Sequence, residues 1–158
     1  MNKLKWILII IAGSSVALFF LIRIIVHLLM QSSPALGLED GRLTDCPDYP
    51  ACVSSQADPQ DETHYVASIQ NTLSVAEAVN KIKSIMSNMK GTELVTENKD
   101  YLHYEIKVAP FGFIDDVEFY FTGDRSPIEL RSSARVPYYD FEVNRKRAED
   151  LRNLFAAE

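Results

Sequence analysis

Residues 101–136 read YLHYEIKVAPFGFIDDVEFYFTGDRSPIELRSSARV, and this stretch decides the fold. Apolar and polar side chains alternate along it in three runs, at residues 101–108, 113–122 and 128–136. Alternation with a period of two is the pattern of a β-strand that buries one face. The links between the runs are short enough for hairpins, so we expect three consecutive antiparallel strands.

The flanking sequence predicts two helices and two further strands. Ser74-Val75-Ala76-Glu77 is a capping box that begins a helix, and apolar positions recur behind it at helical spacing. Residues 64–69 and 92–96 alternate like short strands, and Asp140 can cap a C-terminal helix. The expected order is β-α-β-β-β-β-α. This is an α+β, two-layer domain over residues 63–158, with an antiparallel sheet covered by two helices.

Charged side chains gather on the sheet face that the apolar residues leave open. Asp116 and Glu118 share one strand, and Arg131 and Arg135 share the next, within cross-strand reach. The last helix opens with several cations, which oppose the helix dipole and should pair with carboxylates or help bind an anion. The candidate ligand or ion-pair network comprises Asp115, Asp116, Glu118, Arg131, Arg135, Arg145 and Arg147.

Three interpretations of this network stay open: a solvated salt-bridge ladder, a site for an anion or other ligand, and catalysis by the carboxylates. Carboxylates beside several arginines would be held ionised, which does not suit a general acid. The chain also lacks the H-E-x-x-H, P-loop, dinucleotide-binding and G-x-S-x-G patterns. We therefore assign no catalytic residue, and whether the protein is an enzyme stays open.

Residues 31–62 are rich in proline and form a predicted linker loop that contains both cysteines of the chain. An even cysteine count in a domain expected outside the cytoplasm indicates a disulfide, here between Cys46 and Cys52. A redox, metal-binding or nucleophilic role is the alternative. The histidines of the domain, His64 and His103, have no tight ligand spacing with the cysteines, so we expect no metal site and no cofactor.

The N-terminus predicts a membrane anchor. Residues 6–22 carry no charge, and the apolar character continues past Arg23 to residue 30, which is long enough for a transmembrane helix. Arg23 falls near one end of this span, where it can snorkel to the head groups. Positive charge before the span places residues 1–5 in the cytoplasm and the domain outside.

A cleaved signal peptide is the alternative to this signal-anchor. Ser33-Pro34-Ala35 loosely imitates a cleavage site, but the apolar run is longer than the usual hydrophobic region of a signal peptide. We therefore expect a single-pass protein with a retained helix.

The charge of the part beyond the anchor excludes one class of partner. Residues 31–158 hold all 22 acidic residues and 13 of the 16 Lys and Arg, for a net charge near −9. Nucleic-acid binding rests on cationic side chains that replace counterions, so we expect no nucleic-acid partner. The expected partners are the membrane, through the N-terminal helix, and an envelope protein or a small anionic ligand.

Four separated motifs resemble a known family. They are Cys46-Pro47 with Cys52-Val53-Ser54-Ser55-Gln56, Asp115 to Phe119, Arg131 to Arg135, and Asn144 to Arg147. Together they resemble the domain-of-unknown-function family 1499 over roughly residues 45–155. The resemblance implies a bacterial envelope protein, here of the inner membrane, and it implies no established reaction.

We expect a membrane-anchored, non-catalytic binding or assembly module that uses the acidic and Arg face. The alternative is an envelope enzyme that acts on an anionic or lipid-derived substrate, with Arg131, Arg135 and Arg145 as anion clamps. A third hypothesis, a redox-sensing domain, requires the reduction of Cys46–Cys52 to change partner binding.

Overall fold

The computed structural model describes residues 2–30, 35–136 and 140–157. Its elements are α1 (Lys3–Leu29), β1 (Leu38–Glu39), β2 (Arg42–Leu43), β3 (Cys52–Ser54), α2 (Val75–Ser87), β4 (Thr92–Glu97), β5 (Tyr101–Val108), β6 (Phe113–Phe121), β7 (Ile128–Ala134) and α3 (Val143–Ala156). Five strands form one sheet in the order β3-β7-β6-β5-β4, and every neighbouring pair is antiparallel. The α+β prediction, with an antiparallel sheet and two covering helices, is confirmed.

The hairpin strands β5, β6 and β7 lie where the alternation predicts them. Strand β5 has the predicted bounds, and β6 and β7 end one and two residues earlier than expected. Helix α2 begins at the predicted capping box, in which the Glu77 amide donates to Ser74 Oγ and the Ser74 amide donates to the Glu77 carboxylate. Local sequence patterns suffice to predict these strands because the strands are consecutive and pair with their neighbours in the chain.

The predicted first strand at residues 64–69 is wrong. Within this run Tyr65 and Ile69 each form one isolated bridge, to Ser54 and Ile128. The edge strand beside β7 is instead β3, which lies inside the predicted linker. Its three residues are too few to show any alternation, so their pairing depends on the tertiary structure.

The predicted disulfide is confirmed. Cys46 and Cys52 are bonded with an S–S distance of 2.05 Å, and Cys52 is the first residue of β3. On the chain-entropy model a loop this short contributes about 2–3 kcal/mol. The bond ties the proline-rich segment to the edge of the sheet.

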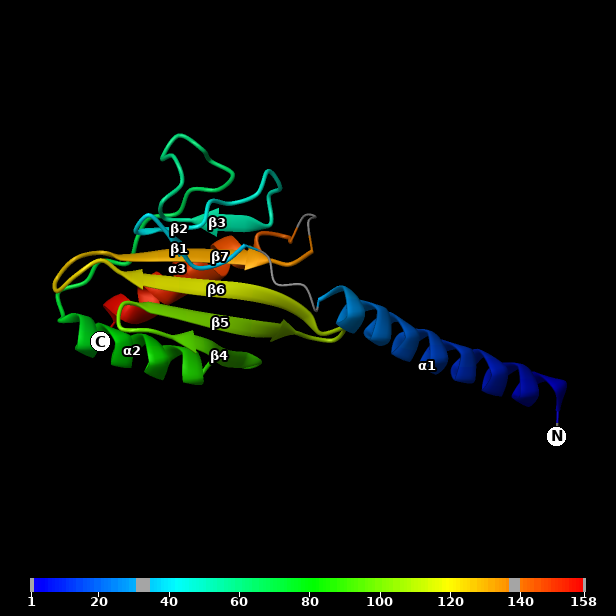
Figure 1. The fold of residues 1–158 in the computed structure, drawn as a ribbon. Coiled ribbons are helices and arrows are strands. Elements are labelled where there is room, and N and C mark those ends of the chain that lie inside the picture. Colours follow the sequence, from blue (N-terminus) through cyan, green and yellow to red (C-terminus); the bar gives the residue numbers. More distant parts are fainter. Residues whose placement is uncertain (1, 31–34, 137–139, 158) are drawn as a thin grey trace.

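The hydrophobic core lies between the sheet and the two helices. We call this side of the sheet the helix face; α3 crosses behind the strands in Figure 1. Leu102, Val117 and Leu130 are buried here from three neighbouring strands. They pack with Ile82 of α2 and Leu151 of α3, which lie on the buried sides of the two helices.

The opposite side of the sheet carries a cover, which the sequence does not predict. The two-stranded β1–β2 sheet lies in front of the large sheet (Figure 1), and β2 contacts β6 and β7. Leu43 of β2 is buried, and its amide donates to the side-chain oxygen of Gln56 at 2.7 Å. We call this side the covered face.

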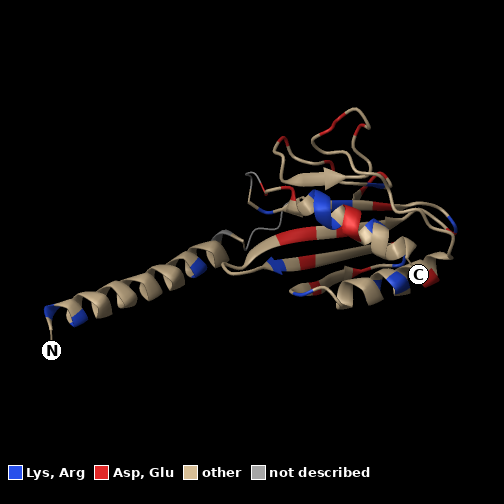
Figure 2. Ribbon diagram, turned by 180° about the vertical axis from the view of Figure 1, so that it is seen from behind, with Lys and Arg blue, Asp and Glu red and all other residues tan. Residues whose placement is uncertain are grey.

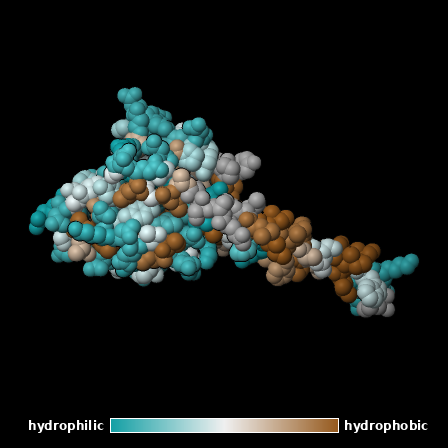
Figure 3. Space-filling view, in the orientation of Figure 1, coloured by the Kyte–Doolittle hydropathy of each residue, from teal (hydrophilic) through white to brown (hydrophobic). Residues whose placement is uncertain are grey.

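Helix α1 projects from the domain as a single apolar rod (Figures 1 and 3). It is long and apolar enough to cross a membrane, and almost none of its surface is buried by the domain. Near its end Arg23 donates to the Pro110 carbonyl at 2.8 Å, between β5 and β6, so this guanidinium has a protein partner. Of the alternative cleavage site, Ser33 and Pro34 lie outside the described residues.

Candidate functional site

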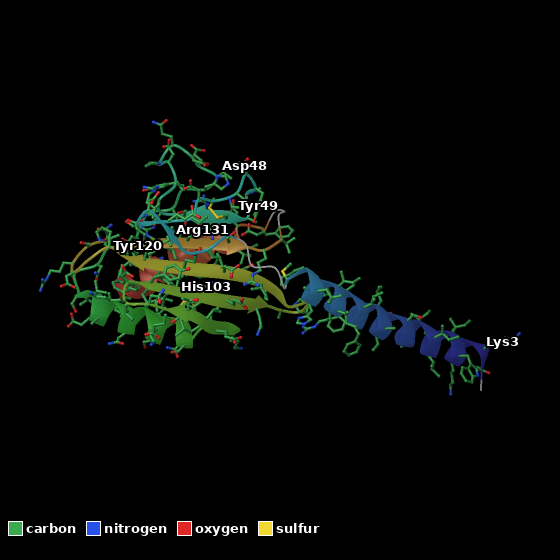
Figure 4. All side chains as sticks on the ribbon, in the orientation of Figure 1. Lys3, Asp48, Tyr49, His103, Tyr120 and Arg131 are labelled. Atoms are coloured by element: carbon green, nitrogen blue, oxygen red, sulfur yellow. A yellow bond between two sulfur atoms is a disulfide. The ribbon has the colours of Figure 1, made fainter. Side chains whose placement is uncertain are left out.

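The predicted site residues are divided between the two faces of the sheet. Neighbouring residues of a strand point to opposite faces, so the side chains of Asp115 and Asp116 face away from each other. In the β6–β7 ladder Glu118 lies opposite Arg131, and Asp115 lies opposite Ala134. The covered face holds Tyr101, His103, Glu105, Asp116, Glu118, Arg131 and Arg135. Figure 4 labels His103 and Arg131 on this side.

Glu118 and Arg131 form a buried ion pair at the middle of the covered face. Arg131 Nη1 donates to Glu118 Oε2 at 2.6 Å, and neither side chain is more than 1% exposed. Glu118 Oε1 also accepts the Tyr101 hydroxyl at 2.6 Å and the Gly37 amide at 2.7 Å. The Gly37 amide belongs to the segment before β1, so the cover itself completes the shell of this carboxylate.

Asp116 and Arg135 form the second pair of the covered face. Asp116 accepts from Arg135 Nε at 2.9 Å and Nη2 at 2.8 Å, a bidentate arrangement. His103 Nε2 lies 2.8 Å from the same carboxylate. Arg135 also donates to Glu105 and to the Met30 carbonyl at 2.9 Å, which joins the end of α1 to the sheet.

The prediction that the charged face of the sheet is open to solvent is therefore wrong. The charged groups pair across the strands as expected, but the cover buries them and supplies hydrogen bonds of its own. Among the described residues, Arg131 Nε is the one buried side-chain polar atom without a hydrogen-bond partner. The network has the form of a closed ladder, with its arginines directed at carboxylates.

Asp115 and Arg147 make a separate pair on the helix face. Arg147 Nη2 donates to Asp115 Oδ2 at 2.6 Å, and both side chains are about nine-tenths buried. Arg147 Nη1 donates to the amide oxygen of Asn144 and to the Ser132 hydroxyl, at 3.1 Å for the latter. The Ser132 hydroxyl donates to the same Asn144 oxygen at 2.6 Å, so strand and helix are joined by a continuous polar network.

Arg145 belongs to neither network. Its guanidinium donates to the backbone carbonyls of Glu62, Thr63 and Tyr65 at 2.8–2.9 Å. It therefore fastens the segment before α2 to the start of α3. In Figure 2, viewed from the helix side, α3 carries both signs of charge in front of the strands. The cations in the first turns of α3 thus each have separate protein acceptors.

Three covered-face members, Tyr101, His103 and Glu105, are absent from the predicted network. They lie on β5, and the alternation of residues 101–108 already places them on the face that carries Asp116 and Glu118. Extending the set by one strand would have found them. Asn144 and Ser132 show no such pattern, because a strand and a helix meet there.

The two neighbouring aspartates have opposite pKa shifts. Burial raises the pKa of Asp115, and the charge and hydrogen bond of Arg147 offset this only in part. Burial also acts to raise the pKa of Asp116, but hydrogen bonds from Arg135 and His103 outweigh it and hold that pKa below its usual value. Burial and the adjacent Glu118 carboxylate raise the pKa of Tyr101, so its hydroxyl stays a donor.

We expect Asp115 and Asp116 to contribute opposite pH dependences to stability. For Asp116 the folded pKa lies below the unfolded value of about 4, so its contribution is present above that pH and is lost as the pH falls through the folded pKa. For Asp115 the folded pKa is the higher one, so stability falls as the pH rises from about 4 through it.

Urea unfolding of the full-length protein in detergent, followed across acidic to neutral pH, checks these two signs. Asp116→Asn should reduce the loss of stability on acidification, and Asp115→Asn should reduce the decline as the pH rises. The two variants are matched controls, since each changes one of two adjacent carboxyls. Curves parallel to the wild type for both variants would contradict the prediction.

An apolar cavity of about 300 Å³ lies at one end of the helix face. Val108 and Phe113 line it from the strand ends that flank the β5–β6 hairpin, and α1 contacts this hairpin. The rest of the wall consists of Asp115, Ala134, Val136, Asp140, Phe141 and Val143. The cavity thus joins an apolar wall to the buried carboxyl of Asp115, at the end of the domain next to α1.

The described residues contain no group of three or more His, Cys, Asp or Glu side chains that could hold a metal ion. His64 is bound within its own loop, with Nδ1 2.7 Å from the Asp61 carboxylate and Nε2 3.2 Å from the Tyr49 carbonyl. His103 is buried against Asp116. Both histidines that the sequence singles out are therefore explained by local hydrogen bonds.

Residues 42–155 match the model of a family described as a protein of unknown function, DUF1499. The matched range begins at β2 and contains the disulfide, the whole five-stranded sheet and nearly all of α3, whereas β1 and Gly37 lie before it. No curated protein and no solved structure matches the chain.

Proposed function

We propose that this chain, which belongs to the DUF1499 family, is a membrane-tethered and non-catalytic domain that binds the apolar part of a membrane lipid. The ligand site is the apolar cavity on the helix face. The domain lies outside the cytoplasm of a bacterial cell, and α1 is a retained single-pass anchor in the inner membrane.

The tether is supported by the composition and surroundings of α1. The helix has an apolar span of 26 residues, with Lys3 and Lys5 at its start, which favours a cytoplasmic N-terminus. The Cys46–Cys52 disulfide fits an oxidising compartment on the other side. A reporter fused after the last residue and active only in the cytoplasm would overturn this orientation.

The cavity carries the binding proposal. Ligand sites are typically concave and mostly apolar, with a few polar groups that orient the ligand. This cavity has that composition, and Asp115 and Asp140 supply the polar groups. Its place beside the hairpin that contacts α1 puts it within reach of lipid, so an acyl chain is the occupant we propose.

The covered-face network supports a structural role, not an anion clamp. Its arginines are paired with carboxylates and its centre is covered by the segment at Gly37. An anion would have to displace both the cover and a buried carboxylate. Binding of an anionic ligand or an envelope protein through these residues is therefore not our proposal.

We expect Ala134→Phe to weaken lipid binding by about tenfold, which corresponds to 1.4 kcal/mol. Ala134 lines the cavity, and a larger side chain there competes with the acyl chain. The measurement is the saturable binding of a phospholipid with a fluorescent acyl chain to the full-length protein in detergent. Ala76→Phe, at an exposed position of α2, is the matched control. Equal binding by both variants and the wild type would sink the proposal.

The second candidate function is catalysis, because Asp115 is a carboxyl with a raised pKa in an apolar cavity. General acids occur in such surroundings. An enzyme would act on the bound lipid, and Asp115→Asn would then keep the binding but lose the turnover. Recovery of chemically unchanged lipid after incubation with the wild type decides for the binding domain.

A further inference from the structure

The tip of the β5–β6 hairpin is apolar and points away from the body of the sheet, toward α1 (Figure 1). From Val108 to Ile114 the chain reads VAPFGFI and carries no charge, between Lys107 and Asp115. Ala109 and Pro110 are exposed and Phe111 is partly buried. An exposed apolar tip on an otherwise acidic domain is an interaction surface.

The hairpin tip lies against the end of α1. The ring centroids of Phe111 and Phe19 are 6.0 Å apart, and Phe111 also contacts Phe113 at 6.1 Å. The Arg23 guanidinium donates to the Pro110 carbonyl at 2.8 Å. Two independent contacts, one aromatic and one polar, thus set the height of the hairpin along the helix.

The position of these contacts along α1 gives the depth of the tip. Arg23 directly follows the uncharged residues 6–22, so it marks the level of the head groups. Phe19 is four residues earlier, about 6 Å deeper along a helix that rises 1.5 Å per residue. Phe111, which lies beside Phe19, is therefore at the depth of the acyl chains.

We propose that the β5–β6 hairpin is a second membrane contact, with Pro110 and Phe111 inserted into the outer leaflet beside α1. This inference rests on the proposed membrane anchorage of α1. The partner that the hairpin contacts is the lipid of the bilayer. Because Val108 and Phe113 flank the hairpin and line the cavity, insertion holds the cavity at the lipid surface and gives an acyl chain a short route into it.

The charge around the tip supports this orientation. Residues 31–158 carry a net charge near −9 and would be repelled by anionic lipid if they lay flat on it. Around the hairpin, however, Arg23, His27 and Lys107 line one hollow with the tip residues. Lys107 pairs with the exposed Glu93, and Arg23 donates to the Pro110 carbonyl. Both cations lie at the level that we assign to the lipid phosphates, so this end of the domain is the one suited to face the membrane.

Tryptophan quenching in vesicles tests the insertion. The full chain with Trp6→Phe and Phe111→Trp has a single tryptophan at the tip, since Trp6 is the one tryptophan of the natural chain. The vesicles contain phosphatidylethanolamine and phosphatidylglycerol, with part of the lipid brominated near the glycerol end. Leu154→Trp in the same background is the control, at an exposed position in the last turns of α3. The wild type reports on Trp6 in the anchor.

We expect a blue-shifted emission and loss of most of the fluorescence for Phe111→Trp, and no quenching for Leu154→Trp. Quenching of Trp6 without quenching at position 111 would overturn the hairpin contact and leave the anchor in place. No quenching of Trp6 would instead overturn the anchorage on which the inference rests. Equal quenching at positions 111 and 154 would also overturn the proposed insertion of the hairpin. Ala109→Trp repeats the test at the tip if Phe111→Trp does not fold.

Discussion

Arg131→Met should lower the free energy of unfolding by about 3–5 kcal/mol, the typical cost of breaking a buried ion pair from one side. The variant leaves the Glu118 carboxylate at 0% exposure with the Tyr101 hydroxyl and the Gly37 amide as its remaining donors. The methionine restores most of the lost packing, so the cost is electrostatic. Urea unfolding of the full-length protein in detergent measures it.

The Lys83–Glu97 pair provides the matched control. It has the same charges and a similar N–O distance of 2.7 Å, but its side chains are 37% and 44% exposed. Lys83→Met should therefore cost at most about 1 kcal/mol. If Arg131→Met costs no more than Lys83→Met, the covered-face pair does not stabilise the fold.

A double variant separates the pair from its surroundings. Removing Arg131 leaves a buried charge, whereas Arg131→Met with Glu118→Gln leaves two neutral side chains. The double variant should cost clearly less than the sum of the two single variants, because the residues are in direct contact. Additive costs would mean that the two side chains act independently.

Local patterns account for the parts of the fold that the sequence predicts. Strand β5 shows full alternation over eight residues and pairs with the next strand in the chain, so its neighbours in sequence determine its structure. Strand β3 has three residues and pairs with β7, about 80 residues away. No local pattern marks such a contact, and the predicted strand fell on residues 64–69 instead.

The candidate site shows the same division. Cross-strand alternation predicts the charge pairing of Glu118 with Arg131, which lie opposite each other in the ladder. It also separates Asp115 from Asp116, but grouping them by sequence proximity placed both in one network. The cover is built from two-residue strands and single hydrogen bonds such as Gly37 to Glu118, which leave no periodic signal.

The three consecutive cations Arg145, Lys146 and Arg147 illustrate this limit, and they supply the second large prediction. They look equivalent in the sequence, yet each has a different set of partners. Arg147 is buried on Asp115, Arg145 donates to three backbone carbonyls, and Lys146 forms an exposed pair with Asp150. A helix with 3.6 residues per turn directs three successive side chains to three different surroundings.

We expect the cost of replacement by methionine to follow burial in the order Arg147, Arg145, Lys146. Arg147→Met leaves the buried Asp115 carboxyl without its ion-pair partner and removes a donor from Asn144 and Ser132. We expect it to lower the free energy of unfolding by about 3–5 kcal/mol near neutral pH. Arg145→Met loses charge-assisted hydrogen bonds, for about 1.5–3 kcal/mol. Lys146→Met should cost about 0.5 kcal/mol or less. Unfolding in urea ranks the three, and equal costs for Arg147 and Lys146 would contradict the order.

The cost of Arg147→Met should also depend on pH, and this dependence identifies Asp115 as the cause. Burial already raises the pKa of Asp115, and removing Arg147 raises it further because the main opposing charge is lost. At a pH below this raised pKa the Asp115 carboxyl is neutral in the folded state, so the missing guanidinium matters less. The destabilisation by Arg147→Met should therefore shrink as the pH falls toward about 4, and Asp115→Asn should abolish that trend. A cost independent of pH would show that Arg147 stabilises the fold through Ser132 and Asn144 and not through the carboxylate.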